Sequence, residues 1–153
     1  MAAVMAATYP ELYGAAGIHS GLAHGSANDV VSAFAAMRGE ISAPRTAGSP
    51  ANRLIVIHGD SDRTVHPANA TNILETLTRG RGEVRSTVLQ DTTGGRMSVR
   101  TVWTDAAGKT CAEHWQIAEA GHAWSGGSPD GSYTDPQGPD ASRQMLRFFL
   151  EAR

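Results

Sequence analysis

One run of five residues, 53–57 (Arg-Leu-Ile-Val-Ile), constrains the fold of this chain more than any other segment. After its first residue it is continuously apolar and rich in β-branched side chains, which is typical of a parallel strand covered on both faces. It ends at His58-Gly59, and Pro67 opens a helical pattern that runs to about Thr78. A strand followed by a helix predicts an arrangement in which helices cover a sheet.

The remaining segments fit the same arrangement. Residues 80–95 are polar and indicate a loop with at most one short strand at 84–89. Strands that alternate with helices predict the α/β class, with a mostly parallel sheet flanked by helices plus an antiparallel β-hairpin. The other elements that we expect are a helix over residues 1–8, a buried strand at 15–20, a helix at 28–38, a hairpin from 97–104 and 110–117, and a closing helix over 140–150.

The expected helix at residues 28–38 has the pattern of an amphipathic helix. Asn28 is a suitable amino-terminal cap, because its side chain can accept a backbone N–H of the first turn. The apolar residues of this helix lie on one face, and they are Val30, Val31, Phe34 and Met37.

Length and composition narrow the function classes. At 153 residues the chain fits one domain, and its net charge of −2 with no basic block argues against a nucleic-acid partner. No apolar run approaches the ~18 residues that a membrane-spanning helix needs. Cys111 is the only cysteine, which excludes an internal disulfide and a zinc site built on sulfur.

Two polar segments follow predicted strands and carry the residue types of hydrolytic chemistry. Asp60 and Asp62 lie in a tight turn soon after residues 53–57, and His122 lies in a glycine-flanked loop after the second hairpin strand. Functional residues of open α/β sheets gather beyond the carboxyl ends of the strands. A carboxylate there can hold the imidazole of a distant histidine in one tautomer. The order Asp before His is the order that follows the nucleophile in α/β-hydrolases.

Each of these residues also has a simpler interpretation. Aspartates after a strand commonly form turns, and a histidine in a loop is commonly structural or solvated. His58 and His66 could join the two aspartates in a metal cluster, but nothing in their spacing demands one. We therefore expect no metal and no cofactor.

Five stretches carry a resemblance to a known family: residues 1–13, 18–22, 58–67, 121–127 and 140–149. In them the chain resembles the carboxyl-terminal half of the poly(3-hydroxybutyrate) depolymerase-like esterases, within the α/β-hydrolase superfamily. The resemblance covers nearly the whole chain, so we expect residues 1–153 to form a single, partial α/β-hydrolase domain. It implies that Asp62, in a Gly-x-x-Asp-x-x-Val pattern, is the catalytic acid, with Asp60 the weaker candidate, and that His122 is the base.

The family's nucleophile is a serine in a Gly-x-Ser-x-Gly elbow, and no serine of this chain has that context. Residues 1–8 begin inside a helical pattern without a cap, which resembles the helix behind the elbow. The resemblance therefore implies that the serine, with the amino-terminal half of the domain, precedes Met1. Ser125 and Ser20 are weaker candidates for a nucleophile. Ser20 is expected to line the substrate site, and Trp124 either contacts substrate or anchors its loop to the core.

The resemblance implies a carboxylic-ester hydrolase with a Ser-Asp-His mechanism that acts on small esters or polyesters. The alternative is a catalytically inactive fragment that only folds or oligomerises. Without the strand that carries the elbow, the strand near Ile18 is an apolar edge, so we expect a homodimer through it. We expect no nucleic-acid or membrane partner. The family suggests a secreted protein, but residues 1–8 form no signal peptide, so the localisation stays open.

Overall fold

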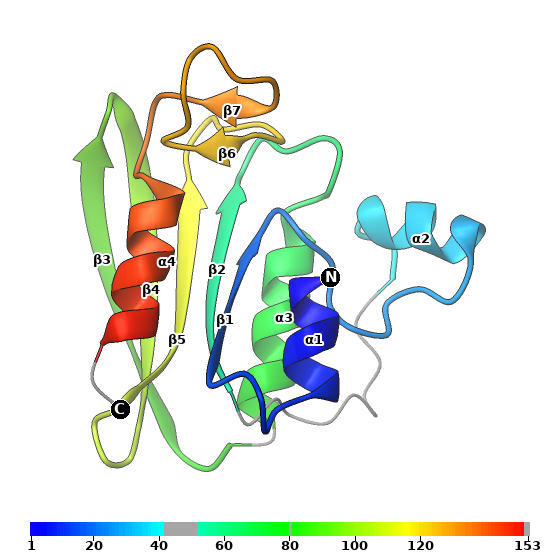
Figure 1. Ribbon diagram of the computed structural model, residues 1–153, viewed down its shortest axis with the longest axis vertical. Helices are drawn as coiled ribbons and strands as arrows, with labels where there is room; N and C mark the ends of the chain where they lie inside the picture. Colours follow the sequence, from blue (N-terminus) through cyan, green and yellow to red (C-terminus); the bar gives the residue numbers. More distant parts are fainter. Residues whose placement is uncertain (42–51, 80, 152–153) are drawn as a thin grey trace.

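A five-stranded sheet forms the centre of the molecule (Figure 1). The computed structural model describes residues 1–41, 52–79 and 81–151. The strands are β1 (Ala15–His19), β2 (Arg53–Gly59), β3 (Val84–Thr93), β4 (Arg96–Asp105) and β5 (Thr110–Ile117), in the spatial order β1-β2-β5-β4-β3. The helices are α1 (Ala2–Thr8), α2 (Val30–Met37), α3 (Ala68–Arg79) and α4 (Ala141–Leu150). A small parallel pair, β6 (Trp124–Ser125) and β7 (Thr134–Asp135), lies beyond the carboxyl end of β5.

The α/β class predicted from the sequence is confirmed, and the sheet is mixed. β1 pairs with β2 and β2 with β5 in parallel, whereas β5 with β4 and β4 with β3 are antiparallel. The predicted hairpin is the β4–β5 pair. Its turn is closed by Asp105, whose carboxylate accepts the backbone N–H groups of Ala107 and Lys109. Three neighbouring strands, β1, β2 and β5, therefore run in one direction and end at the same edge of the sheet.

β2 is buried along its whole length, as its apolar run predicted. Its side chains alternate between two cores. Leu54 and Val56 belong to a cluster with α1 and α3, while Ile55 and Ile57 belong to a cluster with α4. Helices α1 and α3 thus cover one face and α4 the other (Figure 1). Within the described ranges, neither these helices nor α2 is long and apolar enough to cross a membrane.

The helix predicted at residues 28–38 forms, but its apolar face is exposed. Its cap is Asp29 rather than Asn28, because the Asp29 carboxylate accepts the N–H of Ser32 at 2.7 Å. In Figure 1, α2 lies to the side of the two helical layers instead of over the sheet. Three of the four side chains predicted for this face are exposed, namely Val30 (70%), Val31 (79%) and Phe34 (56%), whereas Met37 is half-buried.

The polar segment predicted as a loop is a full edge strand. β3 is ten residues long and pairs with β4 along its whole length. Nearly all its side chains are exposed, so it lacks the apolar alternation by which strands are usually recognised. Its backbone is instead held by the hydrogen bonds that β4 supplies.

The carboxyl ends of β1, β2 and β5 meet at one end of the sheet and position the site. Gly59, the last residue of β2, is paired with Ile117, the last residue of β5. Ser20 follows β1 directly, and its N–H donates to the Ile57 carbonyl at 2.9 Å. The segments singled out in the sequence are thus brought to the same edge.

Candidate active site

The turn after β2 holds Asp62 with both carboxylate oxygens engaged. The residue is only 3% exposed. Its Oδ1 accepts the backbone N–H groups of Thr64 and Val65, each at 2.9 Å. An aspartate that accepts N–H groups two and three residues further on forms a compact turn, so the local segment Asp-Arg-Thr-Val holds the carboxylate in place.

The second oxygen of Asp62 contacts His122. Nδ1 of His122 lies 2.8 Å from Oδ2 of Asp62, although the two residues are 60 positions apart. An ionised carboxylate only accepts hydrogen bonds, so Nδ1 carries the proton and Nε2 is left as the basic nitrogen of the neutral ring. The His122 side chain is 35% exposed and that of Asp62 is 0% exposed. A buried carboxylate therefore supports an imidazole that a substrate can reach.

The pKa of Asp62 lies below its usual value. Burial acts in the opposite direction, because it disfavours the charged carboxylate. The N–H of Val65, the His122 ring and the N–H of Thr64 together outweigh burial. Asp62 is therefore ionised at neutral pH and can stabilise a protonated His122.

Asp60, the weaker candidate for the acid, holds the backbone of the loop that leads to His122. Its Oδ1 accepts the N–H of Glu119 at 2.7 Å and the hydroxyl of Ser61 at 3.0 Å. Glu119 has a φ of 57°, a left-handed conformation that is uncommon for a residue with a side chain. The carboxylate of Asp60 thus secures a bend shortly before His122.

The loop that carries His122 packs against the turn that carries Asp62 through a close approach of Gly59 to Ala120. A Cβ atom on Gly59 would lie 2.2 Å from the Ala120 carbonyl oxygen. That oxygen accepts the N–H of Ser61 at 3.1 Å, while the N–H of Asp60 donates to the Ile117 carbonyl at 3.0 Å. Only glycine leaves room for the turn and the loop to make these bonds.

His58 lies against the Asp62 turn, a position that sequence reasoning missed. The residue is 1% exposed, and its Nε2 lies 2.8 Å from the Val65 carbonyl oxygen and 3.4 Å from Oδ2 of Asp62. Because a carbonyl only accepts, Nε2 carries the proton. Burial is the main cause of a lowered pKa of His58, so the ring is neutral at pH 7. In the ranges that the structure describes, no three His, Cys, Asp or Glu side chains gather as metal ligands.

The two residues predicted to line the substrate site lie at this end of the sheet. Ser20 is 8% exposed and has a φ of 48° at the end of β1. Trp124 is 37% exposed, and its indole N–H donates to Oγ of Ser142 at 3.1 Å. Its ring also stacks on His19, with 4.9 Å between the ring centroids. Trp124 therefore anchors its loop and still presents an exposed surface.

Ser125 and Ser20, the weaker candidates for a nucleophile, have hydroxyls with other partners. The Ser125 hydroxyl donates to the Pro139 carbonyl at 2.6 Å, and the residue is only 2% exposed. The Ser20 hydroxyl lies 3.1 Å from Nδ1 of His19. The Ser125 hydroxyl thus joins its loop to the segment before α4, and the Ser20 hydroxyl binds the neighbouring ring.

His19 is a second member of the site that the sequence analysis did not single out. Its Nε2 accepts the backbone N–H of Ser125 at 3.2 Å. Burial, and then the neighbouring His58 and His122, lower the pKa of His19 to about 4, against the opposing effect of Asp62. Its place at the carboxyl end of a parallel strand is the signal that could have marked it.

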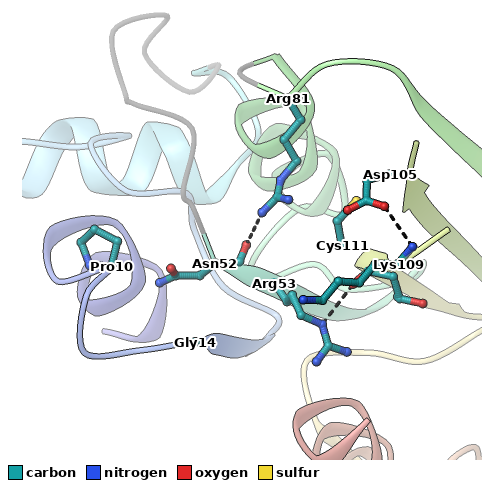
Figure 2. Close-up of a pocket in the computed structure, with 9 residues that line it drawn as sticks. Pro10, Gly14, Asn52, Arg53, Arg81, Asp105, Lys109 and Cys111 are labelled. Atoms are coloured by element: carbon teal, nitrogen blue, oxygen red, sulfur yellow. Dashed lines mark hydrogen bonds between the residues drawn. The ribbon is translucent and has the colours of Figure 1, made fainter. Parts of the chain in front are cut away.

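A separate cavity lies at the opposite end of the sheet, where β2 and β5 begin (Figure 2). It measures about 310 Å³, and its lining includes Arg53, Arg81 and Lys109. The Arg53 guanidinium donates to the carbonyls of Thr110 at 3.0 Å and Phe148 at 2.9 Å. The bond to Phe148 supplies a donor to the last turn of α4, where carbonyls have no partner within the helix, and the bond to Thr110 holds the start of β5. The cation most deeply buried in this cavity therefore has a structural role.

Comparisons with known proteins show which family the chain belongs to. The family model for the esterase PHB depolymerases matches residues 1–101, a range that includes Asp62. Poly(3-hydroxyalkanoate) depolymerase C of Paucimonas lemoignei is 31% identical over 134 residues, which cover 80% of this chain and 32% of that protein. The chain thus spans about a third of the length of this curated relative. It belongs to the PHB depolymerase family of esterases.

Proposed function

We propose that this chain supplies the acid and the base of a serine ester hydrolase, with Asp62 as the acid and His122 as the base. The observation that carries the proposal is the 2.8 Å contact between Oδ2 of Asp62 and Nδ1 of His122. This contact leaves Nε2 to take a proton, while the buried carboxylate stabilises the imidazolium that forms. Membership of an esterase family supports it.

The nucleophile in this proposal is a serine in a Gly-x-Ser-x-Gly turn, contributed by sequence outside the 153 residues. No serine within them has that context. The hydroxyls of Ser20 and Ser125 bind His19 and the Pro139 carbonyl. Residues 1–153 are then one part of a larger α/β-hydrolase domain, and Ser20 lines its site.

The reaction that we propose is acyl transfer to serine and then to water. Nε2 of His122 takes the serine proton as Oγ attacks the ester carbonyl, and gives it to the departing alkoxide. Water, deprotonated by the same nitrogen, then releases the carboxylic acid and the serine. The relative is named for depolymerising poly(3-hydroxyalkanoate), and we extend the class to short esters and such polyesters here. The exposed indole of Trp124 offers the acyl chain an apolar surface.

The test compares the 153-residue chain with the same chain extended by the in-frame sequence upstream of Met1. We expect the extended form to hydrolyse p-nitrophenyl butyrate and the 153-residue chain to show no turnover. In the extended form, His122→Ala and Asp62→Asn should each lower kcat by at least roughly a hundredfold, because the base or its tautomer is lost. His24→Ala is the matched control, since His24 is an exposed histidine.

Two results would contradict the proposal. One is an extended enzyme that keeps full activity after His122→Ala. The other is turnover by the 153-residue chain that Ser20→Ala or Ser125→Ala abolishes, which would place the nucleophile within these residues.

A second candidate function, a non-catalytic module that self-associates, is favoured by the edge of the sheet. β1 pairs only with β2 in the described sheet, so the backbone groups of its outer edge face no strand there. Such an edge can add a strand from another copy. We propose a homodimer through β1, near Ile18, for the 153-residue chain. Light scattering from 10 to 300 µM (roughly the range for weak dimers) should show a mass that rises with concentration. A monomer throughout would contradict it.

A further inference from the structure

His19 connects the end of β1 to the loop that carries His122. Its ring makes three contacts, two of them with that loop. Nε2 accepts the Ser125 N–H at 3.2 Å, and the ring face stacks on the Trp124 indole with centroids 4.9 Å apart. On the other side of the ring, Nδ1 lies 3.1 Å from the Ser20 hydroxyl. One side chain therefore ties two consecutive loop residues to the sheet.

The partners of His19 determine its tautomer. A backbone N–H can only donate, so Nε2 must be unprotonated, and the proton of the neutral ring sits on Nδ1. Nδ1 then donates to the Ser20 hydroxyl. Free neutral histidine prefers the opposite tautomer, with the proton on Nε2, so this arrangement is a specific consequence of the fold.

The surroundings keep this ring neutral. Burial, and then the neighbouring His58 and His122, lower the pKa of His19 to about 4, although the Asp62 carboxylate acts in the opposite direction. Protonation of Nε2 would place an N–H against the Ser125 N–H and break the contact. The contact is therefore intact at neutral pH.

In the described part of the chain, the other hydrogen bonds of residues 124 and 125 go to segments outside β1. Ser125 donates its hydroxyl to the Pro139 carbonyl at 2.6 Å, and the N–H of Trp124 donates to the Tyr133 carbonyl at 2.8 Å. These bonds join the loop to the segment that follows it. Among the residues that the structure describes, His19 is the one whose contacts join residues 124 and 125 to the end of β1.

We propose that His19 is a positioning residue for the base: by holding Ser125 and Trp124, it keeps His122 on Asp62 and fixes the indole beside it. The kinetic consequence rests on the proposed esterase function, whereas the structural consequence does not. Loss of the His19 contacts should let the loop move and weaken the Asp62–His122 hydrogen bond.

The decisive test is NMR spectroscopy of the ¹⁵N-labelled 153-residue chain at pH 7, which requires no catalysis. We expect His19 to show a protonated Nδ1 and an unprotonated Nε2, and His122 to show a downfield Nδ1 proton. His19→Phe keeps a ring for Trp124 but has no acceptor. It should speed exchange of the Ser125 amide roughly fivefold or more, the effect of one lost hydrogen bond, and broaden the His122 signal.

His19→Gln provides a second variant, which offers an acceptor without a ring. It should restore slow exchange at Ser125 while shifting the Trp124 indole resonance. His24→Gln, at an exposed histidine, should change none of these signals. An Nε2-protonated His19, or unchanged Ser125 and His122 signals in His19→Phe, would overturn the proposal.

Kinetics of the extended enzyme then separate the two proposals. We expect His19→Phe to lower kcat roughly five- to tenfold with KM changed less than about twofold. His19→Gln should recover kcat in part and raise KM, since it releases the indole. Unchanged kcat beside altered NMR signals would refute the kinetic effect of His19 as a positioning residue and leave the esterase assignment intact. An inactive parent beside the expected NMR signals would refute the esterase assignment alone.

Discussion

Three histidines at this end of the sheet differ in role because their hydrogen-bond partners differ. His122 faces the Asp62 carboxylate, His58 faces a carbonyl, and His19 faces a backbone N–H. A carboxylate favours the charged ring, a carbonyl selects the Nε2-protonated tautomer, and an N–H demands an unprotonated Nε2. Of the three rings, that of His122 is therefore the one paired with a carboxylate, whereas the other two are bound to backbone groups around it.

His58→Phe tests this division of roles at a single residue. Phenylalanine fills a similar space but leaves the Val65 carbonyl without its donor, in a turn whose other bonds fix Asp62. A buried polar group that loses its partner costs about 1–3 kcal/mol. We expect urea unfolding of the 153-residue chain to show a loss of that size. The control, His24→Phe at an exposed position, should stay within about 0.5 kcal/mol of the parent, and an equal loss in both would refute the role.

Among the elements, those that contribute to the cores are the ones that the sequence predicts best. β2, the β4–β5 hairpin, α3 and α4 all have apolar residues at the spacing that their cores require. The full length of strand β3 and the exposure of the apolar face of α2 were not predicted, for opposite reasons. β3 is polar and is held by its backbone, whereas α2 is amphipathic but lies beside the layers and not over them.

Gly59→Ala tests the packing between the turn after β2 and the loop that leads to His122. The added methyl group would meet the Ala120 carbonyl, which is 2.2 Å away and belongs to the loop that leads to His122. The turn and the loop must then separate, which we expect to cost roughly 1–3 kcal/mol of stability and to weaken the downfield His122 signal. Gly82→Ala is the control, because its Cβ meets nothing within 4 Å. A Gly59→Ala chain as stable as Gly82→Ala, with the His122 signal unchanged, would contradict this.

Across the whole molecule, the site depends on the register of parallel strands. Positions after strands predict Asp60, Asp62 and His122 as candidates, and the family resemblance favours Asp62 over Asp60. The pairing of Gly59 with Ile117 explains why Asp62 and His122 meet. The roles of His19 and His58 could not be predicted in this way. They depend on which backbone groups the fold places against each ring, and spacing along the chain carries no information about that.

The stability of the whole molecule should fall as the solution is acidified. Burial lowers the pKa of His19 and of His114 to about 4, from about 6.5 in the unfolded chain. Between these values the unfolded state binds more protons, so the free energy of unfolding decreases as the pH falls. The pKa values of Asp62 and Glu113 are also lowered, because hydrogen bonds outweigh burial, and their contributions are lost in turn below about pH 5.

Urea unfolding at pH 7.5 and pH 5 measures the histidine part of this dependence. A shift from about 6.5 to about 4 corresponds to a loss of ~2 kcal/mol per histidine over that interval. We expect His114→Gln to remove the contribution of one histidine to this loss. The free energy of unfolding of the variant should therefore fall less than that of the parent between the two pH values. His24→Gln, which replaces an exposed histidine, should lose as much as the parent. Equal losses in all three chains, or a parent that gains stability at pH 5, would show that these buried rings are not held neutral.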